Sequence, residues 1–289
     1  METCYRHTSR ETRVACSNCG RPICPDCMTT TPVGMRCPEC ARDRTPVRTM
    51  RSITAGGLEV TQALIAVNVV VFLASGNYSL TGTAIGGTLI DHGALSAIQL
   101  SSGHDYWRLV TAGFLHQNLL HILLNMYLLY VLGQLLEPAV GRVRFIVIYG
   151  VALLAGSCGS LVGVDPQIST VGASGAVFGL MGAAVVEMRA RGIDPMASGI
   201  PALIFINLLF SVTFSGRISI GGHVGGLIGG VLAALVLGLG DRYRSQLLGL
   251  LGCLVLGAAS VGGAILIAKD KTSAVQIGAL HSRATSSSS

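Results

Sequence analysis

Long apolar blocks alternate with short polar breaks along most of the chain. From residue 58 onward each apolar run approaches the roughly 20 residues that a helix needs to cross a bilayer. The pattern predicts seven membrane spans, at residues 58–76, 116–137, 144–164, 172–188, 198–214, 219–239 and 246–268. We therefore expect an all-α polytopic membrane protein, with a six-span core at 58–240 and an extra seventh helix within 241–268.

Both ends of the chain are polar. Residues 1–57 are rich in cysteine and carry no cleavable signal-peptide pattern. We expect a small folded domain at residues 1–41, followed by a basic linker at 42–57 with the sequence RDRTPVRTMRSITAGG. Residues 269–289, which end in ATSSSS, are expected to form a disordered tail.

Composition and charge support the membrane assignment and predict its direction. Hydrophobic residues make up 51% of the chain and charged residues only 12%, against about 25% charged residues in soluble domains. If the N-terminal domain lies inside, fifteen of the 20 Lys and Arg residues fall on the inner side. Because positive charge marks cytoplasmic segments, we expect a cytoplasmic N-terminus and an extracytoplasmic C-terminus. This topology fits a bacterial plasma membrane.

The N-terminal domain has the spacing of a metal-binding module. Its ligand pairs each enclose two residues, which lets two side chains turn onto one tetrahedral ion. The four pairs are Cys4 with His7, Cys16 with Cys19, Cys24 with Cys27, and Cys37 with Cys40. A disulfide framework is the alternative, but it would leave one of seven cysteines unpaired and give His7 no role. We expect two structural Zn²⁺ ions, and none for catalysis.

Two pairings of these ligands are open. Joining the first pair with the third and the second with the fourth gives an interleaved, cross-braced fold that resembles B-box-type zinc fingers, while sequential pairing fits the spacing as well. Thiolate sites favour a reducing compartment, in agreement with the charge argument. A cytosolic protein is a candidate partner for this domain. Nucleic acid is not expected, since the sequence shows neither an aromatic platform nor a recognition helix.

Polar residues gather near one end of three of the predicted spans. The second, fourth and sixth spans run in the same direction, so their N-terminal ends share a membrane face. The polar groups near these ends are His116, His121, Asn125, Ser174 and His223. Polar side chains inside a membrane are costly and are functional candidates by default.

These residues suggest nucleophilic acyl transfer. Serine needs a base to remove its proton, and His223 is the natural base for Ser174. The helix start at Ser174 supplies backbone N–H groups to a developing oxyanion, and His121 and Asn125 can add side-chain donors. No carboxylate lies where a third member would stand, so we expect a Ser–His dyad. Glycines at positions 175, 179, 222, 226 and 230 would let the fourth and sixth spans pack closely.

The order of these motifs resembles the rhomboid intramembrane serine proteases over about residues 58–240. The matching elements are Trp107–Arg108, the His116/His121/Asn125 series, the GASG of residues 172–175 and the GGHVGG around His223. The resemblance implies cleavage of single-span membrane proteins in the lipid bilayer near the outer face. It implies Ser174 as nucleophile, His223 as base, His121 and Asn125 as oxyanion-hole side chains, and a loop around Trp107 that lies partly in the membrane.

The sequence differs from the rhomboid pattern in places, and two other functions are also compatible with it. The residues expected to support the site are His116, Gly172, Phe178 and Gly226. Phe178 stands where some bacterial members carry tyrosine, and its ring can still stack on His223. The N-terminal domain lies outside the family's common core. The competing functions are a catalytically inactive relative that acts as a membrane-bound binding protein, and an adaptor whose zinc finger recruits a cytosolic partner.

Overall fold

The computed structural model describes residues 2–31, 34–42, 57–76, 78–81, 88–213 and 219–286. The chain divides into two compact units, Met1–Ala55 and Gly56–Ser289, which we call the head and the helical domain. Most of the expected linker, and the last three residues of the expected tail, lie outside the described residues.

The head is built from short elements around its cysteines. Two antiparallel hairpins pair β1 (Glu2–Thr3) with β2 (Glu11–Thr12) and β3 (Thr29–Thr31) with β4 (Gly34–Arg36). A 3-10 turn, η1 (Pro25–Cys27), and one short helix, α1 (Pro38–Arg42), complete it. Six of the seven cysteines are buried together with Ile23. So small a core needs a further source of stability, which in natural domains of this size is often a metal.

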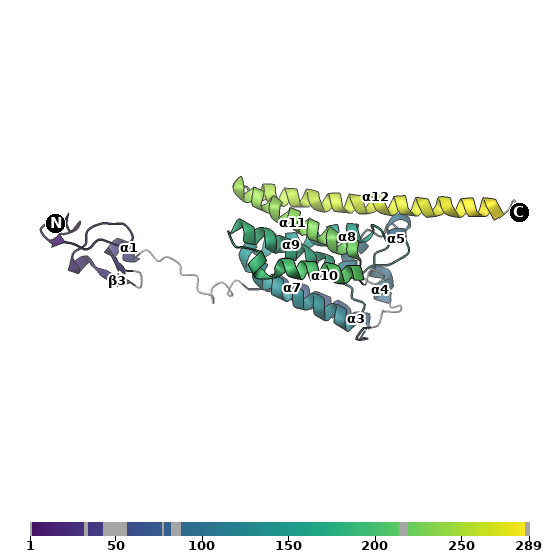
Figure 1. The fold of residues 1–289 in the computed structure, drawn as a ribbon, viewed down its shortest axis with the longest axis horizontal. Coiled ribbons are helices and arrows are strands. Elements are labelled where there is room, and N and C mark those ends of the chain that lie inside the picture. Colours follow the sequence, from purple (N-terminus) through teal and green to yellow (C-terminus); the bar gives the residue numbers. More distant parts are fainter. Residues whose placement is uncertain are drawn as a thin grey trace. The chain divides into compact units, whose positions relative to one another are not determined.

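One long helix overlaps each predicted span of the helical domain. These are α3 (Glu59–Ser75), α7 (Leu119–Val140), α8 (Arg142–Ser160), α9 (Ser174–Ala190), α10 (Ile200–Thr213), α11 (Ile220–Arg242) and α12 (Gln246–Ser286). By length and composition, α7, α8, α11 and the Gln246–Val275 part of α12 can cross a membrane, and α3 is a shorter apolar helix. The helices lie side by side as a bundle (Figure 1).

Short elements fill the connections. Between α3 and α7 lie α4 (Thr88–Gly93), α5 (Ala97–Ser102), α6 (Arg108–Thr111) and η2 (Ala112–Phe114), and η3 (Met196–Ser198) precedes α10. Arg108, at the start of α6, is 5% exposed. Its guanidinium donates to Asp105 at 2.9 Å and to the carbonyls of Asp91 and Ala94 at 2.9 and 2.8 Å. The arginine therefore ties this loop into one folded segment.

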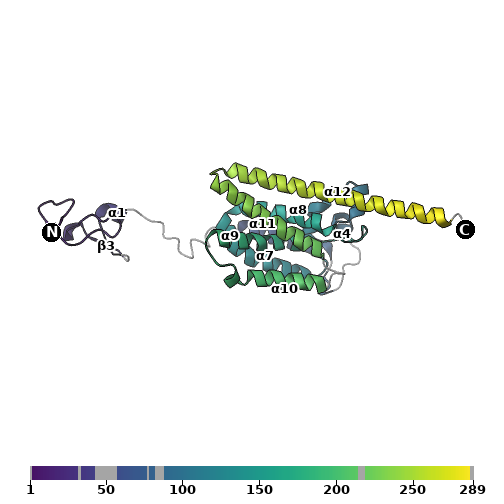
Figure 2. The same ribbon diagram turned by 45° about the horizontal axis from the view of Figure 1, so that its top comes forward.

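The core of the bundle is formed by α7, α8, α9 and α11. Leu129, Phe145, Ile148, Leu180 and Met181 are fully buried there. α12 lies along one side, against α8 and α11, and α10 lies along one edge, against α9 and α11 (Figure 2).

A buried carboxylate joins α3 to α7. Glu137, 2% exposed near the end of α7, accepts the N–H groups of Val60 and Thr61 at 2.9 and 2.8 Å. It also accepts the Thr61 hydroxyl at 2.6 Å. The first N–H groups of a helix have no partner within that helix, so Glu137 caps α3 from another helix.

The expectation for the C-terminal segment was wrong in part. Residues 269–286 continue α12 as helix and are not a disordered tail. The segment KDKTSAVQIGALHSRATS contains no proline and one glycine, so nothing in it terminates a helix that is already propagating.

Candidate active site

Ser174 and His223 meet at the N-terminal ends of α9 and α11. Ser174 is the first residue of α9, and His223 is the fourth of α11. The Ser174 hydroxyl lies 2.8 Å from Nε2 of His223, a normal hydrogen-bond distance. Ser219 caps α11 by accepting the N–H of Gly222 at 3.1 Å. The cap fixes where the helix starts, and therefore how far along it His223 lies.

Glycines make this meeting possible. A Cβ atom added to Gly226 would lie 2.0 Å from the carbonyl oxygen of Gly175, and one added to Gly230 would lie 2.0 Å from that of Gly179. Real Cβ atoms essentially never come this close, so α9 and α11 pack backbone to backbone. This is the close packing that the glycine spacing predicts, and it lets two short side chains touch across the helix pair.

The imidazole of His223 is held on its face and at both ring nitrogens. The Phe178 ring stacks on it with centroids 4.2 Å apart and planes 17° apart, the contact that the sequence allows for phenylalanine here. On the far side from Ser174, the Ser211 hydroxyl of α10 lies 2.7 Å from Nδ1. His223 is 8% exposed and Ser211 only 1%.

Ser211 is absent from the residues predicted from the sequence. A lone serine in an apolar helix is usually a packing residue, and the sequence carries no signal that distinguishes it. The only hint is indirect: no carboxylate is placed to face His223. Among the residues that the structure describes, the hydrogen-bond partners of the His223 ring are Ser174 and Ser211.

His121 and Gly172 border the space in front of Ser174. Gly172 has φ = +133°, and a Cβ there would lie 2.8 and 2.9 Å from Cε1 and Nε2 of His121. The same position is 3.7 Å from the Ser174 hydroxyl. The His121 ring therefore faces the serine across a gap that only glycine leaves open. His121 is placed by the cap of α7, because its N–H donates to the Asn118 side chain at 2.8 Å.

Asn125 lines the same cavity, but part of its amide is used within its own helix. Its Nδ2 donates to the His121 carbonyl at 2.9 Å. An amide nitrogen has two hydrogens, so one remains for another acceptor. His116 is fully buried with its ring centroid 5.0 Å from that of His121. Neither of its ring nitrogens has a partner within the described part of the chain, and it packs behind His121.

A cavity of about 910 Å³ opens onto these residues. Its lining includes Asn118, His121, Asn125, Ser174 and His223. The cavity thus brings together the four residues that the sequence assigns to chemistry. Its volume is within the usual range for ligand pockets, and its walls are largely glycine and aliphatic side chains.

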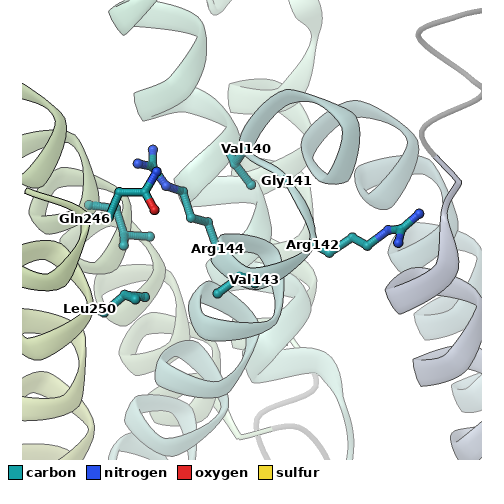
Figure 3. Close-up of a pocket in the computed structure, with 8 residues that line it drawn as sticks. Val140, Gly141, Arg142, Val143, Arg144, Gln246 and Leu250 are labelled. Atoms are coloured by element: carbon teal, nitrogen blue, oxygen red, sulfur yellow. The ribbon is translucent and has the colours of Figure 1, made fainter.

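A smaller cavity of about 400 Å³ lies at the opposite ends of the helices, between the starts of α8 and α12 (Figure 3). In Figure 3 the Arg144 side chain extends toward Gln246 and that of Arg142 extends away from it. Both arginines are ion-paired, Arg142 with Glu59 and Arg144 with Asp241. The lining of this cavity contains no serine, cysteine or histidine.

The head holds two clusters of candidate metal ligands. Each draws its members from two pairs, with all ligand atoms within 4.8 Å of one another. The clusters are Cys4, His7, Cys24 and Cys27, and Cys16, Cys19, Cys37 and Cys40. This is the interleaved pairing, not the sequential one, and all nine cysteines of the chain are free thiols in the structure.

Hydrogen bonds within the second cluster shift its thiols in opposite directions. The N–H of Cys37 donates to Sγ of Cys16 at 3.3 Å, and this bond lowers the pKa of Cys16 to about 6. The backbone hydrogen bond from Cys40 lowers the pKa of Cys37, but burial and the thiols of Cys40, Cys16 and Cys19 outweigh it and raise this pKa to about 12. The grouping of the ligand atoms, four to a cluster, is what would let both clusters hold metal ions.

Comparison with known proteins agrees with the membrane part of this structure. A family model described as "Rhomboid domain" matches residues 103–240. Rhomboid protease GluP of Bacillus subtilis is 36% identical over 155 residues, 53% of this chain and 30% of that protein. RHOMBOID-like protein 6, mitochondrial, of Arabidopsis thaliana is 40% identical over 101 residues, 35% of this chain and 33% of that protein.

One similar protein carries a different description. Inactive RHOMBOID-like protein 8 of Arabidopsis thaliana is 35% identical over 129 residues, 44% of this chain and 36% of that protein. The chain thus spans about a third of the length of these relatives, and the matched segment contains α7 to α11 with the Ser174–His223 pair. Residues 103–240 match the rhomboid domain, and the chain is similar to rhomboid proteins.

Proposed function

We propose that this protein is an intramembrane serine endopeptidase that uses a Ser174–His223 dyad. The observation that carries the proposal is the 2.8 Å contact between the Ser174 hydroxyl and Nε2 of His223 at the cavity. A nucleophile within hydrogen-bond reach of a base that is itself held in place has the arrangement of activated serines. The similarity to the Bacillus subtilis protein named rhomboid protease GluP supports the same function.

The reaction begins with attack of the Ser174 oxygen on the substrate carbonyl carbon, while Nε2 of His223 takes the hydroxyl proton. The resulting oxyanion forms beside the start of α9, where the first backbone N–H groups have no helical partner. His121 and the free amide hydrogen of Asn125 provide further donors. His223 then returns its proton to the leaving amine as the C–N bond breaks, and water releases the acyl group by the same steps.

The substrates that suit this site are single-span membrane proteins. The catalytic pair lies four residues or fewer from the starts of α9 and α11, so it is near one membrane face and not at the bilayer centre. A transmembrane segment would present its scissile bond there. We assign this face to the extracytoplasmic side of a bacterial plasma membrane, with the head in the cytoplasm, because basic residues concentrate on the opposite side.

The deciding experiment is cleavage of a co-expressed single-span reporter. The wild type should cut it, and Ser174→Ala and His223→Ala should not. Ser260→Ala is a matched control, since its hydroxyl donates to the Leu256 carbonyl within α12 at 2.9 Å and Ser260 does not line the cavity. Equal cutting by wild type and both site variants would refute the dyad.

The alternative is a membrane-bound binding protein without catalysis. The 35% identical relative described as inactive favours keeping this alternative. The two functions differ in one measurement: a serine-reactive fluorophosphonate probe should label the wild type but not Ser174→Ala if the serine is activated. An unlabelled wild type that still captures single-span proteins would support the binding function.

For the head we propose two structural Zn²⁺ ions. Two sulfurs bound to one tetrahedral zinc at ~2.3 Å lie about 3.8 Å apart, and Sγ of Cys19 lies 3.8 Å from Sγ of Cys37. In the other cluster Nδ1 of His7 lies 3.3 and 3.4 Å from the sulfurs of Cys24 and Cys27. Four protein ligands leave no open coordination position, so the ions would stabilise the fold of the head. The role proposed for the folded head is to recruit a cytosolic protein. Metal analysis of the full chain should find zinc; iron or no metal would refute this.

A further inference from the structure

The Ser211 hydroxyl connects the imidazole of His223 to the backbone of α10. It lies 2.7 Å from Nδ1 of His223 and also 2.7 Å from the carbonyl oxygen of Asn207, one turn earlier in the same helix. With 1% of its surface exposed, Ser211 is shielded from water. We propose that Ser211 is a positioning residue that holds His223 in the tautomer required for proton abstraction.

The direction of the two hydrogen bonds follows from counting hydrogens. A serine hydroxyl has one hydrogen and can accept with its lone pairs, whereas a carbonyl only accepts. If Ser211 donated to His223, its oxygen and the Asn207 carbonyl would face each other at 2.7 Å with no hydrogen between them. Ser211 therefore donates to Asn207, and Nδ1–H of His223 donates to Ser211.

This arrangement leaves Nε2 of His223 without a hydrogen. Its lone pair faces the Ser174 hydroxyl at 2.8 Å, which is the tautomer that can take the proton of a nucleophile. When His223 becomes an imidazolium during the proposed reaction, the Nδ1–H bond to Ser211 is kept. Ser211 thus orients the histidine as the aspartate of a Ser–His–Asp triad does, but it carries no charge.

A neutral third residue suits this location. A carboxylate at this buried position would be costly when ionised unless several donors satisfied it. The hydroxyl is satisfied by one donor and one acceptor that the structure already supplies. The same link makes the geometry of His223 depend on α10, a helix that lies at the edge of the bundle (Figure 2).

The activity test rests on the proposed function and compares three variants in the reporter assay. Ser211→Ala should lower kcat about ten- to hundredfold with little change in KM, as expected when a buried N–H loses its acceptor. Ser211→Thr should restore most of the rate, because threonine can make the same bond to the carbonyl four residues back. Ser260→Ala loses an equivalent bond in α12 and should behave as wild type. Unchanged kcat in Ser211→Ala would overturn the proposal.

A second measurement does not depend on catalysis. In full-length protein labelled with ¹⁵N-histidine, at a pH where imidazole is neutral, the resonances lost in His223→Gln identify this ring. They should show a protonated Nδ1 in the wild type and in Ser211→Thr, and a mixture of tautomers in Ser211→Ala. An unchanged tautomer in Ser211→Ala would overturn the proposal, even if activity fell. A shifted tautomer in a chain that cleaves nothing would uphold Ser211 as the positioning residue and refute the protease.

Discussion

Replacing Gly226 with alanine places a methyl group where α9 and α11 touch. The new Cβ would lie 2.0 Å from the carbonyl oxygen of Gly175, 2.6 Å from its carbonyl carbon and 2.9 Å from its Cα. These neighbours are backbone atoms, so no side chain can rotate away. The two helices must separate.

The size of that separation can be worked from the contact. An ordinary van der Waals contact for a Cβ begins at 3.4 Å, so the closest pair must move apart by about 1.4 Å. Ser174 precedes Gly175 directly, and His223 lies one turn before Gly226. Carried to the site, this movement lengthens the 2.8 Å Ser174–His223 contact to about 4 Å, beyond hydrogen-bond reach. A misplacement of this size costs roughly a hundredfold in rate, or about 3 kcal/mol.

The assay is initial-rate cleavage of a purified single-span substrate in detergent or liposomes, with circular dichroism melting to follow stability. Gly238→Ala is the matched control, because it lies in the same helix and its Cβ would meet nothing within 4 Å. Alanine is also the better helix former there, by about 1 kcal/mol. We expect a rate loss and a lower melting temperature only for Gly226→Ala. Equal behaviour of the two variants would refute the close-packing argument.

Three further predictions concern the site, the buried carboxylate of α7 and the head. Gly172→Ala should abolish most cleavage with a folded helical domain, because its Cβ would lie 2.8 Å from the His121 ring at φ = +133°; full activity would contradict the gap assigned to the oxyanion. Glu137→Gln should lower the free energy of unfolding by about 1–3 kcal/mol, since the cap of α3 loses an acceptor, while Glu187→Gln, at a long 3.4 Å contact, should change it little; equal effects would contradict the capping role. Cys24→Ser should remove one of two zinc ions and loosen the head while reporter cleavage continues; loss of cleavage would show that the helical domain depends on the head.

Much of the site could be predicted because short sequence patterns, each readable on its own, place the same residues at one end of the bundle. Span direction placed Ser174 and His223 at the same end of neighbouring helices, and four-residue glycine spacing predicted their close packing. Pair spacing predicted the eight ligands of the head but left both pairings open, and the structure brings them together as the interleaved clusters. The signal at the site is clear because polar side chains are rare and energetically costly inside a membrane span.

Other features are set by contacts that no local pattern encodes. Ser211 is one of several hydroxyls in apolar helices, and only the three-dimensional fold shows that it faces Nδ1 of His223. The capping role of Glu137 requires knowing that the end of α7 meets the start of α3. The helical continuation past Ala268 arises because α12 was already formed, although the polar composition there favours disorder. Short helices α4 to α6 lack the periodic stretch that would reveal them.

The link between Glu137 and α3 has a consequence for biosynthesis. The acceptor for the N–H of Val60 is Glu137, which is synthesised 77 residues later in the chain. At roughly 5–20 residues per second, the ribosome needs about 4–15 seconds to supply it. During that interval the first helix can enter the bilayer with its leading N–H groups exposed only if water, lipid headgroups or the insertion machinery satisfy them. Once α7 is complete, Glu137 can replace these temporary partners as the acceptor for the N–H groups of α3. Formation of the Glu137 bonds would therefore mark the time at which α3 joins the bundle.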